Sequence, residues 1–564
     1  MPVASGRRTG LVLAAVFALV LAAALGTDIG SRGGSGPGVV RVIAFNDLHG
    51  NLEPPSGSSA EVTADDGTQV EAGGAAFLAA HVERLRAEQP SSVLLSAGDN
   101  VGASPLTSAL FHDEPTIELL DAMGVAASAA GNHEFDEGID ELRRLVSGGC
   151  RPAGGCRFGP AHDGASFPVL AANLTSTGGA DDARTGSPAL PAHTVLDVGG
   201  TRLGVIGATL TELPDLVSPD GIRGIEVGDE IAAVDAASRE LTAQGVRAQV
   251  LLVHQGDGTG SDGGGPGSCA LEPDGPGSAI AAGVSADVDA VFSAHSHQQY
   301  VCSVTDPAGE QRPFVQGLSF GRLLSVVDLA LTGDGDVDRA ATTARNEIVS
   351  RDIEPDPAAQ RIVDAAVRGS EPLAQRPVGT LAAPLPRAAE ASGLSPLGTV
   401  IADAQLAASR GDGAQLALTN PGGVRADLVP GPDGRVTYGQ AYTVQPFGNI
   451  LQTMTLTGAQ LRAVLDQQFT VDDGPTVLQT SSNVRYSVAG DRVTGIELDG
   501  APVTDAGTYR VAVNNFLSAG GDGFDAFTAG TDLVGGPVDL DAFVAHLEAS
   551  PGLAPPPTDR VTRD

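Results

Sequence analysis

Short apolar runs alternate with amphipathic stretches along the first half of the chain. Val39 to Phe45 and Ser92 to Ala97 are rich in β-branched and apolar residues, which predicts two buried strands. Between them, apolar side chains recur at helical spacing from Gly74 to Glu88, so we expect a helix that joins the strands. Helical spacing returns from Thr107 to Met123 and from Glu230 to Gln244. This alternation indicates a layered α/β domain.

Polar residues follow five apolar runs directly, where each predicted strand ends. The segments are Asn46-Asp47-Leu48-His49-Gly50, Gly98-Asp99-Asn100, Gly131-Asn132-His133-Glu134-Phe135-Asp136, His254 after Gln249 to Val253, and His295-Ser296-His297 after Ala290 to Ala294. Because open α/β sheets bind ligands beyond the carboxyl ends of their strands, we expect these side chains to meet in one crevice. A His beside an Asn in one turn is more often a capping or surface residue, but five such strand ends are improbable for solvated loops.

The residue types in these segments indicate a metal site. Asp, His and Asn without Cys suit Zn, Mn or Fe at mixed nitrogen and oxygen sites, and do not suit a structural thiolate zinc. Two metals that share one carboxylate would use all of these side chains. In this order the segments resemble the calcineurin-like metallophosphoesterases, in the branch of the bacterial periplasmic 5′-nucleotidases, over roughly residues 38 to 330.

The resemblance implies two divalent ions, zinc, manganese or similar. By this resemblance one ion is held by Asp47, His49, Asp99 and His297, and the other by Asp99, Asn132, His254 and His295. Asp99 then bridges the ions, which would lie about 3.5–4 Å apart and lower the pKa of a water that attacks phosphorus in line.

The resemblance also implies a catalytic dyad. His133 is expected not to bind metal but to stabilise the transferring phosphoryl group or protonate the leaving oxygen, with Asp136 orienting it and favouring its charged form. Glu134 is expected to be structural. One small departure from the family is Ala294, since a Gly usually precedes the residue that corresponds to His295.

A second set of motifs extends the resemblance to about residue 535. It comprises Leu397 to Ala404, Ala417 to Arg425, Val444 to Asn449 and Val513 to Phe524. These motifs resemble the C-terminal domain of the same nucleotidases, which binds the nucleoside and swings towards the metals. In this family an Arg commonly lies a few residues before the Leu-Gly of the first helix, at a position that falls near Gly393 here. Arg387 is the nearest alternative, which leaves the number of substrate phosphates open.

Five residues of these motifs are candidates for substrate binding. Asn420 and Arg425 flank a Gly-rich turn where backbone approaches a ligand closely, and Arg suits a phosphate or another anion. Phe447 and Phe516 stand in Gly-flanked loops and would clamp a base between their faces, at about 1–3 kcal/mol for each ring. Asp522 would accept hydrogen bonds from ribose hydroxyls. The alternative for the two Phe residues is plain core packing.

We therefore expect an α/β fold of two domains. The first is a four-layer metallophosphoesterase β-sandwich flanked by helices, and the second is a C-terminal α/β substrate-binding domain. The expected boundaries are a signal peptide at 1–28, the metallophosphoesterase domain at 38–350, a helical linker at 351–375, the nucleoside-binding domain at 376–540 and a C-terminal helix and tail at 541–564. We expect an edge strand between Val326 and Asn346.

The charge of the chain bears on its partners. The 564 residues carry 33 Lys and Arg against 69 Asp and Glu, a net charge of -36, and every basic residue except His is Arg. This balance makes a nucleic-acid-binding surface improbable and favours solubility. An anionic substrate must therefore be attracted locally, by metals and nearby Arg side chains.

The N-terminus predicts export. Arg7-Arg8 precedes an apolar run from Leu11 to Leu25, which fits a secretory signal and is short for a spanning helix of about 20 residues. The alternative is an uncleaved anchor. We expect a secreted or cell-envelope protein without stable membrane insertion after cleavage. The oligomeric state is left open.

Four cysteines, an even count, agree with an oxidising compartment. We interpret Cys150 and Cys156 as a clip in a Gly/Pro-rich loop. Cys269 and Cys302 would brace the loop before His295 to the strand after His297. The alternative is four free buried thiols.

Taken with the resemblance, these features predict an exported two-metal phosphohydrolase that converts nucleoside 5′-monophosphates to nucleoside and phosphate. The alternatives with the same metal set are a 2′,3′-cyclic-nucleotide phosphodiesterase, a nucleotide-sugar or dinucleotide pyrophosphatase, and a thiosulfohydrolase. The two Phe residues favour a substrate that contains a base. A metal-free secreted binding protein is disfavoured because every ligand position is filled.

Overall fold

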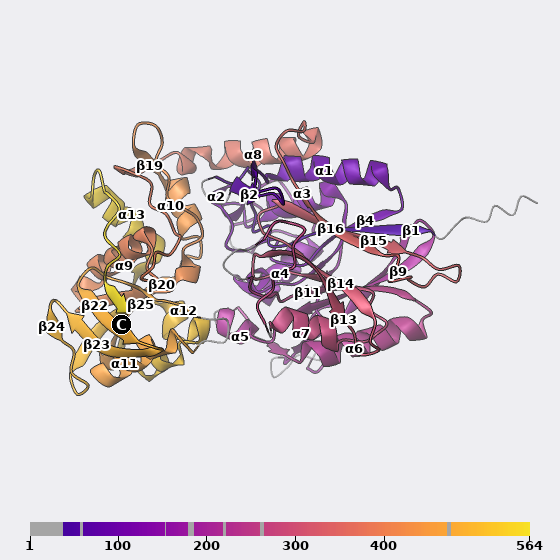
Figure 1. The fold of residues 1–564 in the computed structure, drawn as a ribbon. Coiled ribbons are helices and arrows are strands. Elements are labelled where there is room, and N and C mark those ends of the chain that lie inside the picture. Colours follow the sequence, from indigo (N-terminus) through magenta and orange to yellow (C-terminus); the bar gives the residue numbers. More distant parts are fainter. Residues whose placement is uncertain are drawn as a thin grey trace, which may run out of the picture. The chain divides into compact units, whose positions relative to one another are not determined.

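Two six-stranded sheets form the first domain of the computed structural model (Figure 1). The structure describes residues 38–563 except 57–59, 153, 179–184, 218–220, 260–263, 274 and 471–474. The predicted signal peptide at 1–28 lies outside the described residues.

The first sheet carries three of the five predicted strand ends. Its order is β16 (Thr343–Ile348), β15 (Leu323–Ala330), β1 (Val39–Phe45), β4 (Ser92–Ser96), β5 (Val125–Ala129) and β6 (Val169–Leu170). From β1 to β6 neighbouring strands are parallel, whereas β15 is antiparallel to both β1 and β16. The carboxyl ends of β1, β4 and β5 therefore lie at one edge of the sheet.

The second sheet carries the other two predicted strand ends. Its order is β13 (Gln299–Thr305), β14 (Gln311–Gly317), β12 (Ala290–Ser293), β11 (Ala248–His254), β9 (Thr201–Thr209) and β8 (His193–Val198). The four inner strands are parallel, and the two outer strands are antiparallel to their neighbours. The five strand ends thus come from two sheets and not from one open sheet.

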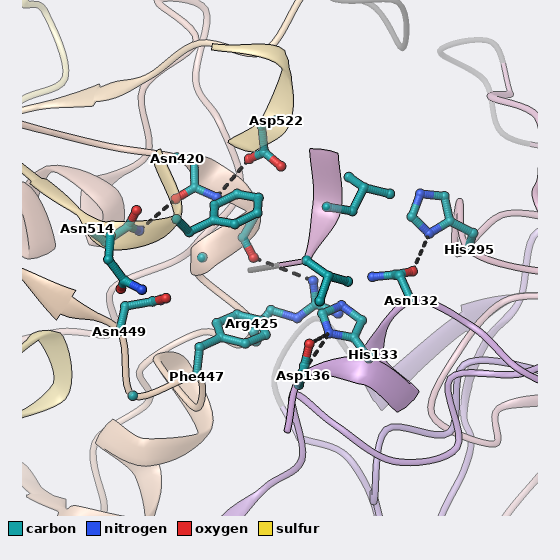
Figure 2. A pocket seen from close by; sticks show the side chains of 17 residues that line it. Asn132, His133, Asp136, His295, Asn420, Arg425, Phe447, Asn449, Asn514 and Asp522 are labelled. Atoms are coloured by element: carbon teal, nitrogen blue, oxygen red, sulfur yellow. Dashed lines mark hydrogen bonds and ion pairs between the residues drawn. The ribbon is translucent and has the colours of Figure 1, made fainter. Parts of the chain in front are cut away.

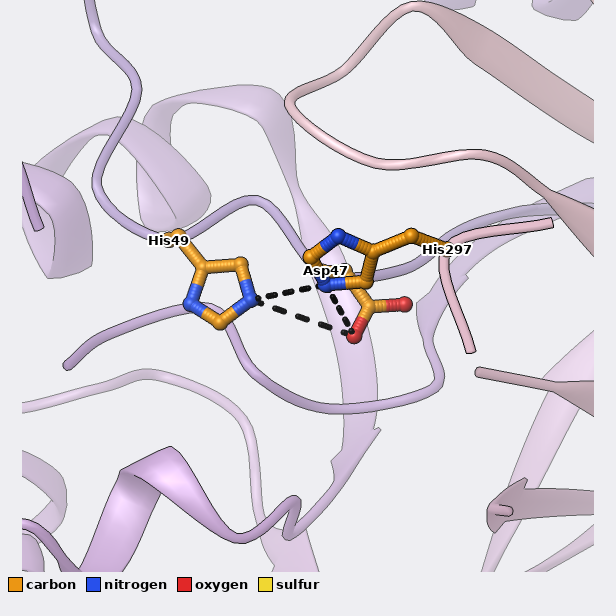
Figure 3. A group of neighbouring side chains, drawn as sticks. All are labelled: Asp47, His49 and His297. Carbon is orange, nitrogen blue, oxygen red and sulfur yellow. Dashed lines mark hydrogen bonds and ion pairs between the residues drawn. The ribbon is translucent and has the colours of Figure 1, made fainter. Parts of the chain in front are cut away.

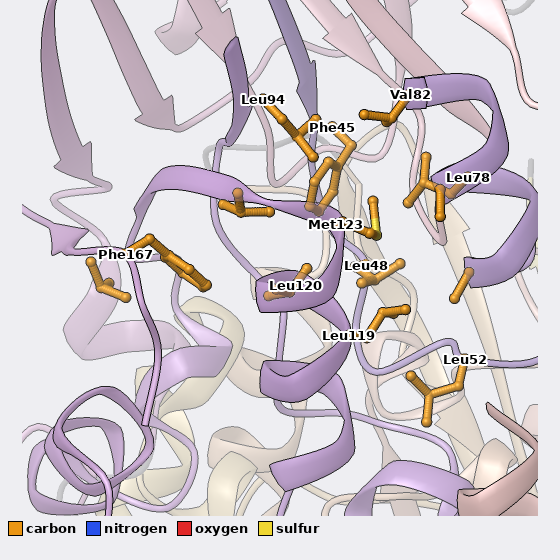
Figure 4. Packing of buried hydrophobic residues seen from close by; sticks show 14 of the residues in the cluster. Phe45, Leu48, Leu52, Leu78, Val82, Leu94, Leu119, Leu120, Met123 and Phe167 are labelled. Carbon is orange, nitrogen blue, oxygen red and sulfur yellow. The ribbon is translucent and has the colours of Figure 1, made fainter. Parts of the chain in front are cut away.

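Alternating side chains explain why the two sheets stack. In β1, Val42 and Ala44 pack between the sheets against the second sheet's Val205 and Leu252. The neighbouring residue Phe45 points the other way, into the core that α1 (Ala75–Glu88), α3 (Glu114–Met123) and α8 (Pro357–Ala374) cover (Figure 4).

The second sheet is covered on its outer face in the same way. α6 (Glu230–Ala243) and α7 (Pro276–Gly283) pack there against side chains of β9, β11 and β12. The domain therefore has the expected four layers, with helices on both outer faces (Figure 1).

Two predicted elements are divided in the structure. The helical pattern from Thr107 to Met123 forms two helices, α2 (Leu106–Ala109) and α3, because His112 and Asp113 adopt left-handed backbone with φ of 56° and 57°. The Asp113 carboxylate holds this break, since it accepts a hydrogen bond from the Ser108 hydroxyl at 2.6 Å. The single edge strand expected between Val326 and Asn346 is a hairpin of β15 and β16, of which only β16 lies at the edge.

The second domain is a smaller α/β unit. Its five-stranded sheet has the order β21 (Gln479–Thr480), β18 (Leu416–Thr419), β25 (Thr508–Asn514), β20 (Ile450–Thr457) and β26 (Thr531–Val538). Its α-helices are α9 (Pro396–Ser409), α10 (Tyr438–Val444), α11 (Gly458–Gln467), α12 (Asn515–Ser518) and α13 (Asp539–Ala549). A four-stranded sheet follows, β24 (Ala501–Pro502), β23 (Arg492–Leu498), β22 (Val484–Ala489) and β27 (Val561–Arg563), so the tail contributes a strand. The domain boundaries given above stay a prediction.

Small elements complete the described fold. They are β2 (Glu61–Thr63), β3 (Gln69–Glu71), the 3-10 turn His133–Phe135, α4 (Ile139–Ser147), β7 (Leu174–Ser176), α5 (Leu213–Leu216), β10 (Ile225–Val227), β17 (Pro377–Thr380), β19 (Arg435–Thr437) and the 3-10 turns Arg410–Asp412, Pro421–Gly423, Gly521–Gly523 and Asp525–Ala529. No helix among the described residues is long and apolar enough to cross a membrane.

Both disulfides have the interpreted connectivity. Cys150 is bonded to Cys156 and Cys269 to Cys302. The second bond joins the segment before α7 to β13, the strand that follows His297. It therefore fixes two segments that flank one of the candidate metal-binding loops.

Candidate metal centre and adjoining cavity

The five strand ends converge where the two sheets meet. One group of side chains is Asp47, His49 and His297, in which the His297 Nε2 lies 3.5 Å from the Asp47 Oδ1 and 3.2 Å from the His49 Nε2 (Figure 3). These three ligand atoms lie close enough together to hold one metal ion.

A second group lies next to the first. The Asp99 Oδ2 is 3.1 Å from the His254 Nε2, and these two residues form a potential metal site with His295. The Asn132 Oδ1 is 3.0 Å from the His295 Nδ1. Because the Asp99 Oδ2 is also only 3.6 Å from the His49 Nε2, the Asp99 carboxylate lies between the two groups.

The backbone at these residues is unusual. The residues with positive φ include Asp47, His49, Asp99, His295 and His297, with values from 47° to 70°. Left-handed backbone at residues other than Gly costs about 1–3 kcal/mol and clusters at functional sites. The strands therefore end in turns that aim these side chains at one point, at a cost in conformational energy.

Glycines allow the loops to approach each other. A Cβ on Gly131 would collide with the Asp99 carboxylate. A Cβ on Gly98 would come within 2.8 Å of the His254 Nδ1 and would meet the Gly131 backbone. The Gly-Asp and Gly-Asn-His sequences are thus required by close packing of the two loops.

Backbone carbonyls orient two of the histidines. The His49 Nδ1 lies 3.0 Å from the Gly102 carbonyl oxygen, and the His254 Nδ1 lies 2.9 Å from that of Ala97. Each contact places the proton on Nδ1 and turns Nε2 towards the centre, as is common for histidine metal ligands. The buried His254 Nε2 faces the Asp99 Oδ2 at 3.1 Å and the Asp47 Oδ1 at 3.9 Å. This arrangement fits a divalent cation.

The charges of the side chains in this centre also agree with a divalent cation. Burial raises the pKa of Asp47, but His297 and His254 outweigh it and the pKa falls to about 2. Burial, together with His254, lowers the pKa of His295 to about 3. Burial also lowers the pKa of His254, but the Asp99 and Asp47 carboxylates raise it to about 10. The two carboxylates therefore attract positive charge to this centre.

His133 and Asp136 form a close pair beside the centre. The His133 Nδ1 lies 2.9 Å from the Asp136 Oδ2, and the carboxylates of Asp136 and Asp99 raise the pKa of His133 in spite of its burial. His133 also comes close enough to His49 and Asp99 to complete a third potential metal group. The geometry is therefore compatible with an acid and with a ligand.

Glu134 connects the two loops that carry Asp99 and Asn132. Its buried carboxylate accepts hydrogen bonds from the backbone N–H of Asp99 at 2.8 Å, of Asn100 at 2.8 Å and of Gly131 at 2.6 Å. The expectation of a structural residue is compatible with these contacts.

A cavity of about 360 Å³ adjoins the metal centre (Figure 2). Nine of the residues singled out from the sequence line it: Asn132, His133, Asp136, His295, Asn420, Arg425, Phe447, Phe516 and Asp522. Both domains contribute to this wall. Asp47, His49, Asp99, His254 and His297 are not among the lining residues and belong to the candidate metal centre next to the cavity.

A chain of amides holds one wall of this cavity. The Asn420 Nδ2 donates to the Asp522 Oδ2 at 2.7 Å, and the Asn514 Nδ2 donates to the Asn420 Oδ1 at 3.1 Å (Figure 2). Asn514 and Asn449 line the cavity but were not among the predicted site residues. Their position beside Phe516 and Phe447 in Gly-containing loops is the sequence signal for them.

Leu216 and Val217 also line the cavity and were missed. They lie at the end of α5, in a segment without any polar motif. Only the fold brings them to this wall.

Arg425 lies between the cavity and the metal centre. Its Nη2 is 3.5 Å from the His49 Nε2, and its guanidinium carbon lies 5.8 Å from the centroid of the Phe447 ring. Burial, and then the charge of Arg387, lowers the pKa of Arg425. Arg387, the nearest alternative to the Arg expected near Gly393, is therefore close enough to Arg425 for their charges to interact.

Comparisons with known proteins agree with this architecture. Residues 40–299 match the family described as calcineurin-like phosphoesterase, and residues 377–529 match the family described as 5′-nucleotidase, C-terminal domain. Endonuclease YhcR of Bacillus subtilis is 32% identical over 90% of this chain, but the chain covers only 40% of that protein's length. Cell wall protein Lmo0130 of Listeria monocytogenes is 28% identical over 90% of this chain and 67% of its own length.

A solved structure resembles both domains together. The 5′-nucleotidase precursor of Thermus thermophilus superposes with a TM-score of 0.76 at 25% identity, over 93% of this chain and 99% of that one.

Proposed function

Because the chain belongs to the calcineurin-like phosphoesterases that carry a 5′-nucleotidase C-terminal domain, we propose that it hydrolyses nucleoside 5′-monophosphates to nucleoside and phosphate. The observation that carries this proposal is the 360 Å³ cavity, whose wall includes His133 and Asp136 as well as Phe516 and Asp522. A molecule with a phosphate at one end and a nucleoside at the other fits such a wall.

In this proposal two divalent cations occupy the metal centre. Asp47, His49, Asp99 and His297 would hold one, and Asp99, Asn132, His254 and His295 the other. When bound, the ions supply Lewis acidity that polarises the phosphoryl oxygens and lowers the pKa of a water.

Three side chains act on the phosphate from the cavity. Arg425 neutralises the charge that the phosphoryl oxygens bring into a strongly acidic protein. His133 donates a proton from Nε2 to the leaving O5′ oxygen, because its Nδ1 faces Asp136. Asp136 keeps the imidazole oriented and protonated, in line with the raised pKa of His133.

The nucleoside binds along the wall of the second domain. Asp522 lines the cavity and accepts hydrogen bonds from the ribose hydroxyls, while the Asn420 Nδ2 donates to the Asp522 Oδ2 and holds that carboxylate in place. Phe516 lies half-buried at the cavity and offers a ring face to the base. Because every base has a face that can stack on an aromatic ring, we expect broad base tolerance.

Turnover of AMP by the purified protein tests the proposal. We expect hydrolysis that chelation abolishes and that added Zn²⁺ or Mn²⁺ restores, with metal analysis giving two ions per chain at full activity. Adenosine and inorganic phosphate are the products to be measured. A metal-loaded protein that hydrolyses p-nitrophenyl phosphate but does not hydrolyse AMP would reduce the function to an unspecified phosphoesterase.

We also propose that the protein acts outside the cytoplasm. Two disulfides and a relative named as a cell wall protein support this address. Fractionation of cells that express the whole chain, with mass spectrometry of the mature N-terminus, tests it.

A further inference from the structure

A second cavity, of about 380 Å³, shares Arg425 with the first. Its other lining residues include Glu53, Phe320, Thr437, Gln440 and Thr443, from both domains. The function proposed above uses none of these five.

The second cavity reaches the candidate metal centre through Phe320. The Phe320 ring centroid lies 6.0 Å from that of His49 and 5.6 Å from that of His297. The Phe320 backbone N–H also donates to the Asp47 carbonyl oxygen at 2.8 Å, so the ring is fixed beside the centre. Arg425, 3.5 Å from the same His49, lies at the junction of the two cavities. A phosphorus bound at the centre therefore has a cavity available for each of two substituents.

The lining of the second cavity indicates which substituent fits. The Glu53 carboxylate, the Gln375 amide and the Ser56 hydroxyl line this cavity at exposed positions, and Phe320 offers a ring face. The side chains of Asn51, Thr437 and Gln440 line it as well but are hydrogen-bonded to the protein backbone. The carboxylate of Glu53 repels an anion, while it accepts hydrogen bonds from hydroxyl groups. This combination suits an uncharged group that carries several hydroxyls, such as a sugar or a polyol.

We propose that the second cavity binds an uncharged polyol or sugar esterified to the same phosphorus as the nucleoside. This inference rests on the proposed function and extends its substrate class from nucleoside monophosphates to nucleoside phosphodiesters. The nucleoside occupies the first cavity and the polyol the second.

The reaction balances as a hydrolysis. The oxygen of one water forms a bond to phosphorus, and the bond between phosphorus and the O5′ oxygen breaks. The O5′ oxygen takes a proton from His133 and leaves as the nucleoside. The polyol keeps the phosphate as a monoester, and one proton is released at neutral pH.

A matched pair of substrates tests the inference. AMP is compared with the diester in which the phosphate of AMP also carries glycerol. We expect the metal-loaded protein to hydrolyse the diester with a kcat/KM within about tenfold of that for AMP. In ¹⁸O-labelled water the label should appear in glycerol phosphate, with adenosine as the other product. If AMP and glycerol form instead, the polyol is the leaving group and the nucleoside keeps the phosphate. That result would overturn the assignment of the two cavities.

Variants that fill the second cavity provide a second test of the inference. Thr443 is half-buried on α10, and its hydroxyl donates to the Gly439 carbonyl oxygen at 2.9 Å. Thr443→Phe should lower kcat/KM for the diester at least tenfold and leave AMP within twofold. Thr443→Val removes the hydroxyl without filling space and is the matched control. Gln375→Trp, at an exposed position of the same lining, gives an independent block if Thr443→Phe does not fold.

The outcomes separate this inference from the proposed function. Hydrolysis of AMP without hydrolysis of the diester, or equal loss of both substrates in folded Thr443→Phe and Gln375→Trp, overturns the second cavity as a subsite and leaves the nucleotidase proposal standing. Failure of the wild-type protein on both substrates overturns both.

Discussion

The Phe447 ring stacks on the imidazole of His133, with ring centroids 5.5 Å apart and planes inclined by 21°. The sequence predicts that Phe447 clamps the base together with Phe516. In the structure it also contacts the candidate acid and lies under the Arg425 guanidinium. Phe447 is therefore expected to influence the reacting end of the substrate, and Phe516 is the cleaner reporter of base binding.

The first prediction separates the two Phe residues. Phe516→Ala should weaken kcat/KM for AMP by about 1–3 kcal/mol, the value of one stacked base, and leave p-nitrophenyl phosphate nearly unchanged. Phe447→Ala should lower turnover of both substrates, because the support of His133 is lost with the ring. Steady-state kinetics on the two substrates measures this. If Phe516→Ala lowers both substrates equally, its ring is core packing and not part of a base clamp.

The second prediction concerns the role of His133. His133→Ala should lower kcat by about 10²–10⁴ with metal content unchanged, because a positioned acid contributes that much. Metal analysis by mass spectrometry is the deciding measurement, since His133 also lies within reach of His49 and Asp99. Loss of one ion per chain would make His133 a ligand.

The third prediction tests the shared carboxylate. Asp99→Asn should nearly abolish hydrolysis and weaken binding of both ions, because Asp99 lies between the two groups of side chains. Circular dichroism should show an intact fold. Full turnover of the variant at saturating metal would contradict the bridging role.

The fourth prediction concerns Glu134. Its carboxylate accepts three backbone N–H groups, so Glu134→Gln places an amide N–H₂ against at least one of them. The free energy of unfolding should fall by about 1–3 kcal/mol for an unsatisfied buried donor, and metal affinity should fall as the two loops separate. Glu137→Gln, at an exposed position nearby, is the control. Equal metal affinity in both variants would remove the positioning role of Glu134.

The fifth prediction is a pH dependence of stability. Burial raises the pKa of Asp539 from 3.8 to about 6, so its contribution to folding is fully present below about pH 3.8 and is lost as the pH rises through about 6. Asp539→Asn should therefore be more stable than the wild-type protein at pH 8, by about 1–3 kcal/mol, and similar to it at pH 4. Urea unfolding at the two pH values measures the difference. An Asp539→Asn variant that is less stable than the wild-type protein at pH 8 would refute the reasoning.

The convergence of the candidate metal ligands was predictable in large part because each of them follows an apolar strand directly. The sequence of β1 places Asp47 at a strand end whatever the rest of the fold does. The break between α2 and α3 was not predictable from periodicity, because His112 and Asp113 adopt a backbone conformation that the Asp113 hydrogen bonds stabilise. The alternating pattern predicts one strand where the structure has the hairpin of β15 and β16, because alternation does not mark where a chain reverses.

The contacts between the two domains could not be predicted from the sequence either. The stacking of Phe447 on His133 joins residues more than 300 positions apart, and only the folded chain brings them together. Thr443 and Phe320 of the second cavity are likewise brought to one cavity only by the folded chain, and neither belongs to a recognised motif.

The left-handed turns at the strand ends lower the stability of the metal-free fold, and they position the side chains that would bind the metal ions. Glycine at His297 would relieve the left-handed backbone and remove an imidazole whose pKa burial lowers, and the strain of about 1–3 kcal/mol exceeds the roughly 0.4–1 kcal/mol of unfolded-chain entropy that Gly adds. Directed evolution that rewards only survival of heating in the presence of a chelator should therefore enrich glycine at this position. The same experiment with a metal buffer should retain His297, because the bound cation then supplies more folding free energy than the strain removes.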